Sequence, residues 1–101
     1  MSIDSNLDQA SNKLTIAVDG RFDFSAHKDF RDSYEALEAK PEKFSIDMGG
    51  ANYIDSSALG MLLLLRDHAG GDQADVEIVN CSSDVKKILT ISNFDQLFSI
   101  H

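Results

Sequence analysis

The chain has 101 residues, of which 43% are hydrophobic and 26% are charged. This length and composition are typical of one globular domain with a modest core, so we expect a single domain over residues 1–101 and exclude a disordered chain. The formal net charge of −8 disfavours nucleic acid and anionic membrane surfaces, which are themselves negative, and favours a basic patch on a protein partner.

Targeting and metal-binding signals are missing from the sequence. The N-terminus has no signal-peptide pattern, and the longest apolar run, 59–65, is too short to span a bilayer, so we expect a soluble, cytoplasmic protein. Cys81 is the only cysteine, and we interpret it as a small buried or half-buried hydrophobe. The histidines are dispersed, which predicts no metal site and no cofactor. They are His27, His68 and His101.

The first half of the chain reads as strand, helix, strand. Residues 13–18 are rich in β-branched side chains and predict a strand that Gly20 ends. Apolar residues at helical spacing then predict a helix from Ser25, its candidate N-cap, to a point just before Pro41. Residues 44–48 alternate as a second strand, which we expect Gly49-Gly50 to end.

The second half continues the alternation. A helix opened by Ser56 or Ser57 is predicted to run to about Ala69, where Gly70-Gly71 stops it. A strand over 76–79 follows, then a short capped helix from about residue 83 and a last small helix and edge strand over 94–100. Strands that alternate with helices predict an α/β fold with a mixed, mostly parallel sheet and helices packed on it.

The leucine-rich helix has a second apolar side. At about 100° per residue, one side of this helix should face the sheet, while Leu63 and Leu64 fall on the opposite side together with Gly60 and Asp67. Either another element covers these leucines, or they form an exposed apolar patch of the kind that marks a protein interface.

The turn before that helix places a carboxylate beside two hydroxyls. Asp55, Ser56 and Ser57 follow a short hydrophobic segment, and Ser56 is predicted at or next to the helix N-cap, where free N–H groups and the helix dipole favour negative charge. These residues suit phosphorylation of Ser56, but Ser and Asp are also the ordinary caps of ordinary helices.

Two segments together resemble a known family. Phe44-Ser45-Ile46-Asp47-Met48, the Gly49-Gly50 turn and Tyr53-Ile54-Asp55-Ser56-Ser57-Ala58-Leu59-Gly60 resemble the signature of the STAS domain family, whose single-domain members include bacterial anti-sigma factor antagonists. Upstream, the segment Leu14–Phe24 resembles the strand, glycine and hydrophobe-Asp turn that precede the family's first long helix. Ala58 departs from the glycine that is common in the family, and the 49–52 turn is looser, which weakens the fit to any particular kinase.

The resemblance implies a phosphorylation switch. Ser56 matches the serine that a partner kinase, itself the anti-sigma factor, phosphorylates and that a PP2C-type serine phosphatase restores. Ser57 is the neighbouring, less favoured hydroxyl, and Asp23 and Asp55 match acidic positions near the acceptor. We expect unphosphorylated protein to bind its partner and phosphorylated protein not to. The predicted partner interface consists of Ala58, Gly60, Leu63, Leu64 and Asp67.

Other functions stay open at this point. An enzyme is disfavoured, because the sequence has no Ser-His-Asp ordering, phosphate-binding loop or metal cluster. A non-switching STAS subunit, such as the partner of a lipid-transport ATPase, would bind constitutively through the same helix. A STAS regulator of biofilm or motility, acting through a response regulator with kinase and phosphatase domains, would use the same surface and the same modification.

Overall fold

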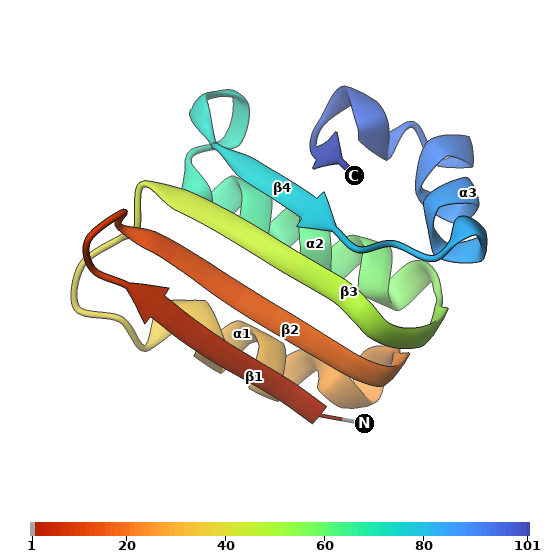
Figure 1. Cartoon of the computed structure of the whole chain (residues 1–101), viewed down its shortest axis with the longest axis horizontal. Helices are drawn as coiled ribbons and strands as arrows, with labels where there is room; N and C mark the ends of the chain where they lie inside the picture. The colour runs from red at the N-terminus through yellow and green to blue at the C-terminus, as the bar shows by residue number, and fades with distance from the viewer. Residues whose placement is uncertain (1) are drawn as a thin grey trace.

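Two long neighbouring strands, β2 and β3, organise the structure, a computed structural model that describes residues 2–101 (Figure 1). The strands are β1 (Ser2–Asp8), β2 (Lys13–Phe22), β3 (Lys43–Ile54), β4 (Val76–Val79) and β5 (Ser99–Ile100). The α-helices are α1 (His27–Glu35), α2 (Ser56–Ala69) and α3 (Ser83–Ile91). Short 3-10 turns are η1 (Phe24–Ala26), η2 (Gly71–Gln73) and η3 (Phe94–Gln96).

The sheet is mixed and mostly parallel, as predicted. Its spatial order is β1-β2-β3-β4-β5. β1 runs antiparallel to β2, while the pairings of β2 with β3, β3 with β4 and β4 with β5 are parallel. Helices α1 and α2 lie together on one face of the sheet, and α3 lies beyond the ends of the central strands (Figure 1). The α/β class predicted from the sequence is confirmed.

The core lies between the sheet and the two helices α1 and α2. Alternate residues of β2 and most of the first half of β3 are buried, and the parallel register pairs Leu14 with Phe44 and Ile16 with Ile46. From α2, Leu62 and Leu65 are fully buried in the same cluster. The sheet-facing side of α2 is therefore the one that its apolar spacing predicts.

Both central strands extend past the glycines that we expected to end them. β2 continues through Gly20 to Phe22, and β3 continues through Gly49-Gly50 to Ile54. Gly20 has a φ of 88° beside a shift in the β2–β3 register, so it forms an irregularity within the strand. Gly50 faces Asp19, whose Oδ1 would lie 2.5 Å from a Cβ at that position. The glycines thus permit a local irregularity, and the pairing resumes beyond them.

The remaining differences lie at element ends. α1 ends at Glu35, with Ala36 as its C-cap, so the prediction that it runs to just before Pro41 was wrong: a proline sets a limit that a helix cannot pass, and the chain leaves the helix earlier. β1 was not predicted from the sequence, because its residues are polar except for Ile3 and Leu7. These two side chains are partly buried in the structure. The first helical segment is capped by Asp23 rather than Ser25, and opens with the η1 turn before α1. The predicted limits of α2 are confirmed, with Gly70 at a φ of 125° directly after the last turn.

Candidate functional site

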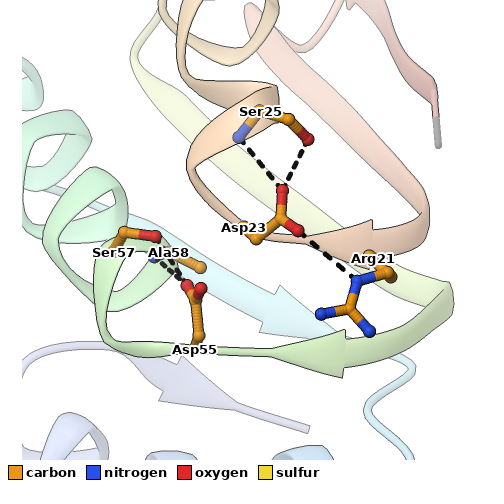
Figure 2. Close-up of polar contacts among 6 residues, drawn as sticks. All are labelled: Arg21, Asp23, Ser25, Asp55, Ser57 and Ala58. Carbon is orange, nitrogen blue, oxygen red and sulfur yellow. Dashed lines mark hydrogen bonds and ion pairs between the residues drawn. The ribbon is translucent and has the colours of Figure 1, made fainter.

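Two acidic turns lie side by side where β2 and β3 end. Phe22 and Ile54 are paired in the parallel register, so Asp23 and Asp55, the next residue of each strand, lie on neighbouring loops. Figure 2 shows both carboxylates turned toward the start of the helical segment that follows each one. The sequence placed these two acids near the predicted acceptor, and the structure brings them together.

Asp55 is the N-cap of α2. Its Oδ1 accepts a hydrogen bond from the Ala58 backbone N–H at 3.0 Å and from the Ser57 hydroxyl at 2.7 Å (Figure 2). Ser56 is the first residue of the helix; it is exposed and takes no part in this network. The sequence left open whether Ser56 is the cap or stands next to it, and the structure places it next to the cap.

The neighbouring turn repeats the same arrangement. Asp23 Oδ1 accepts hydrogen bonds from the Ser25 backbone N–H at 3.0 Å and from the Ser25 hydroxyl at 2.5 Å (Figure 2). The Arg21 Nε lies 3.4 Å from Asp23 Oδ2, and its guanidinium carbon is 3.8 Å from the centre of the Tyr53 ring. Sequence reasoning missed these partners, although an Asp-x-Ser pattern at both strand ends could have revealed Ser25.

Both carboxyl groups are held in the charged form. The Ser57 hydroxyl, followed by the Ala58 N–H, lowers the pKa of Asp55, while partial burial and the charge of Asp23 oppose that shift. The Ser25 hydroxyl, followed by its backbone N–H, lowers the pKa of Asp23. The two turns therefore present adjacent negative charges at neutral pH.

One side of α2 carries Ser56 and the uncovered leucines. Ser56, Gly60, Leu63 and Asp67 recur at helical spacing, and with Leu64 they form what we call the acceptor face. The exposed fractions of Leu63 and Leu64 are 41% and 56%, so no other element among residues 2–101 covers them. The exposed patch, one of the two possibilities left by the sequence, is the one that the structure shows.

Ala58 does not belong to the acceptor face. Its exposed fraction is 0%, because it is turned into the core beneath α2. The prediction that Ala58 contributes to a partner interface was therefore wrong. The residue type at this position therefore bears on packing inside the domain and does not form part of the exposed surface.

Other candidate groups stay apart from the acceptor. His27 stacks on the exposed ring of Phe24 with the ring centres 5.3 Å apart, while His68 packs against Tyr34, two turns further along α1. Burial raises the pKa of the Cys81 thiol, as expected for a half-buried hydrophobe. Within residues 2–101, no three His, Cys, Asp or Glu side chains group as metal ligands.

A half-open cavity of about 430 Å³ lies beside the site, between the end of β3 and the start of α3. It is lined by residues 51–54 together with Ser82, Asp84, Val85 and Ile88. Neither Ser56 nor the two capping carboxylates line it. The acceptor face and this cavity are therefore separate surfaces.

No helix in the described part of the chain combines the length and apolar composition needed to cross a membrane.

Comparison with known proteins identifies related sequences and folds. Residues 5–99 match the STAS_2 family, described as "Mlab, STAS domain". The chain is 60% identical over 88 residues to a STAS-domain containing protein of Pseudomonas aeruginosa strain UCBPP-PA14, and this similarity covers 87% of each chain.

Two of the solved structures with a similar fold are forms of an anti-sigma factor antagonist. One is the anti-sigma factor antagonist SpoIIAA in its unphosphorylated form, with a TM-score of 0.76 and 14% identity over 99% of this chain and 87% of that one. The other is the Bacillus SpoIIAA in its phosphorylated form, with a TM-score of 0.74 and 14% identity over 99% of this chain and 91% of that one.

Proposed function

The chain belongs to the STAS domain family, and from this membership and the geometry of the α2 N-terminus we propose that it is a partner-switching regulator of the anti-sigma factor antagonist type. Reversible phosphorylation of Ser56 controls its binding to a serine kinase that is also the anti-sigma factor, and a PP2C-type serine phosphatase reverses the modification. In this proposal the protein is a substrate and a binding partner, and it performs no catalysis of its own.

The single observation that carries the proposal is the difference between the two adjacent serines. The Ser57 hydroxyl donates to Asp55 at 2.7 Å and is half-buried, whereas Ser56 is exposed and lies outside that hydrogen-bond network. A kinase must reach the acceptor oxygen and align it with the phosphoryl group, so a free and exposed hydroxyl is the better substrate. This supports Ser56 as the acceptor and gives Ser57 a role in holding Asp55.

The chemistry is phosphoryl transfer from ATP bound by the kinase. The Ser56 oxygen forms a new bond to the γ-phosphorus, the bond from that phosphorus to the ADP oxygen breaks, and the hydroxyl proton leaves to a base of the kinase. The phosphatase reverses the modification with water, which yields inorganic phosphate. SpoIIAA, which shares the fold, is known in an unphosphorylated and a phosphorylated form, and this supports the same cycle here.

The location of Ser56 explains how phosphorylation can change binding without unfolding the domain. A phosphate adds a charge of about −1.5 to −2 at pH 7. The N-terminus of α2 tolerates that charge because of the helix dipole. The partner meets the new charge next to Asp55 and in line with the exposed Leu63, so the cost of desolvating the interface rises sharply.

Peptide mapping of protein from its native cells tests the acceptor directly. We expect phosphate on the Ser56 side chain in the wild type and in Ser57→Ala, which is the matched control, and none in Ser56→Ala. In a capture experiment, Ser56→Ala should retain the partner and Ser56→Asp should lose it. Equal capture by these two variants, or phosphate found on Ser57 alone, would contradict the proposal.

A second candidate is a STAS subunit that binds its partner constitutively. The exposed Leu63 and Leu64 favour it, because an apolar interface on α2 needs no phosphate to form. The same mapping separates the two candidates, since a constitutive subunit would carry no phosphate on Ser56. A STAS regulator of biofilm or motility would use the switch described above with a different downstream partner.

A further inference from the structure

One edge of β3 is open over the last residues of the strand. Among residues 2–101, the pairing of β3 with β4 ends at Asp47↔Val79, whereas β3 itself continues to Ile54. On its other edge β3 stays paired with β2 up to Ile54, so this stretch keeps the conformation of a strand. Figure 1 shows β3 running on past the end of β4. Residues 51–54 are therefore held as a strand with one unpaired edge.

The chain turns away from β3 directly after β4, at Asn80. This residue has a φ of 59°, a left-handed conformation that asparagine tolerates, and its side-chain amide donates to Asp47 Oδ1 at 3.1 Å. Ser82 follows as the N-cap of α3 and accepts a hydrogen bond from the Val85 N–H. Because hydrogen bonds fix both the turn and the cap, the start of α3 is held in place beside the open edge.

The half-open cavity of about 430 Å³ lies along this edge. It is enclosed by residues 51–54 of β3 and by four residues at the start of α3, namely Ser82, Asp84, Val85 and Ile88. Its volume is within the range of about 300–1,000 Å³ that is usual for ligand pockets. Two exposed hydrophobic side chains, Tyr53 and Ile88, border it from the two elements. We call this cavity, with its lining residues, the β3–α3 groove.

Tyr53, the aromatic wall of the groove, is held from the neighbouring strand. Arg21 is its partner in the β2–β3 register, and the Arg21 guanidinium carbon lies 3.8 Å from the centre of the Tyr53 ring. Arg21 is itself held by Asp23, with 3.4 Å between Nε and Oδ2. This wall is therefore preformed, which lowers the entropic cost of ordering it when a ligand binds.

The backbone of an unpaired strand edge is a binding surface in itself. Each residue of a strand carries an N–H and a C=O group, and those on an open edge are free to bond with another chain. When an extended peptide adds to such an edge, the main chain supplies affinity and alternate side chains enter neighbouring pockets. The β3–α3 groove combines the two features, since the edge of residues 51–54 lies beside an apolar pocket formed with Val85 and Ile88.

The charge of the groove indicates which peptide would fit it. Among the lining residues that the structure describes, Asp84 alone is charged at neutral pH. It is exposed and forms no ion pair with another residue in the range 2–101. The whole chain carries a formal net charge of −8. A segment with a basic residue therefore complements the groove, and an acidic segment is repelled.

We propose that the β3–α3 groove binds an extended segment of a partner protein, which adds to the open edge of β3 as a further strand. The segment places aliphatic side chains against Val85 and Ile88 and a basic side chain near Asp84. The groove shares no residue with the acceptor face. This docking site is therefore additional to the proposed switch, and it does not require phosphate on Ser56.

NMR titration of the full-length, ¹⁵N-labelled protein with synthetic peptides tests this docking site. The probe is an acetylated and amidated six-residue peptide of alternating valine and lysine. We expect saturable shifts of the backbone amides of residues 51–54 and of the first turn of α3. Affinity should fall by about tenfold when glutamate replaces lysine, because of repulsion by Asp84, and by about tenfold when every peptide amide is N-methylated, because the added strand then has no N–H to donate.

Two variants of α3 locate the contact. Ile88→Gln removes part of the apolar wall and should weaken binding of the valine–lysine peptide by about fivefold. The matched control is Ile91→Gln, the same change at a more exposed position outside the groove, and it should leave the affinity unchanged. Asp84→Asn should remove the preference for lysine over glutamate. Thermal melts of each variant confirm that it is folded.

Equal affinity of the N-methylated and unmodified peptides would overturn the docking proposal, because the cavity would then take side chains or a small apolar ligand without an added strand. Shifts confined to the exposed edge of β1 would also overturn it. So would the absence of shifts at residues 51–54 at peptide concentrations up to about 5 mM, since main-chain pairing gives weak binding to any extended sequence. None of these outcomes depends on phosphate at Ser56, so the docking proposal and the proposed function fail separately.

Discussion

The same substitution, glycine to alanine, should change stability in opposite directions at Gly60 and Gly50. At Gly60 the added methyl group meets no atom within 4 Å, so the change carries no steric cost. What remains is the helix propensity difference, about 0.8 to 1.0 kcal/mol in favour of alanine. In a domain of this size, 1 kcal/mol corresponds to a rise in melting temperature of about 4 to 8 °C.

At Gly50 the same methyl group has no room. Its Cβ would lie 2.5 Å from the Asp19 Oδ1 and 3.2 Å from the Asp19 Cα, in the neighbouring strand. The exposed carboxylate can rotate away, but the Cα belongs to the β2 backbone and must shift. We expect Gly50→Ala to lower the free energy of unfolding by about 1 kcal/mol, the low end of the cost of overpacking.

Urea denaturation of the wild type and the two variants, with thermal melts as a second measurement, gives the sign of each change. Unchanged m-values would show that the unfolded state is the same in all three proteins. The reasoning is refuted if Gly60→Ala is less stable than the wild type, or if both variants shift in the same direction. Either result would mean that the local environment of these glycines differs from the one described above.

Three further predictions concern the cap and the core of α2. The lowered pKa of Asp55 means that its carboxylate stabilises the fold above its unfolded-state pKa and loses this effect as pH falls through its folded-state pKa. The stability difference between wild type and Asp55→Asn at pH 7 should therefore shrink in urea titrations as the pH is lowered below about 4. Ser57→Ala should lower the free energy of unfolding by about 1 kcal/mol, whereas Ser56→Ala should change it by less than about 0.5 kcal/mol. Leu62→Ala, at a position with 0% exposure, should cost about 2 to 5 kcal/mol in the same assay, and Leu64→Ala less than about 0.5 kcal/mol.

The sequence predicted best those elements whose limits are set by local chemistry. The start and end of α2 follow from a capping group and from Gly70, both within one turn of the helix ends. The small α3 is likewise capped by Ser82, whose hydroxyl oxygen accepts a hydrogen bond from the Val85 N–H at 3.2 Å. Such signals need no knowledge of distant residues, and for that reason they can be recognised in a single sequence.

The strands were harder to predict because their length depends on distant partners. β3 continues through Gly49-Gly50 because residues 50–54 pair with the end of β2, and neither segment alone predicts that pairing. β1 is a polar segment that becomes a strand by pairing along the whole range from Ser2↔Asp19 to Asp8↔Lys13. A strand is recognised in a sequence by the alternation of apolar and polar residues, which arises when one face of the strand is buried. In β1 only two side chains are half-buried, so this alternation is weak.

The extended end of β3 also decides which serine is free. Because Ile54 is still paired with Phe22, β3 ends at Ile54. The next residue, Asp55, is therefore the N-cap of α2. Ser57 then stands two residues after the cap, where its hydroxyl reaches back to the Asp55 carboxylate. Had the strand stopped one residue later, Ser56 would have been the cap, and its hydroxyl would have been the one occupied by the helix N–H groups. The choice between two adjacent hydroxyls, on which the proposed switch depends, is therefore made by long-range strand pairing, and this is why the local motif alone left it open.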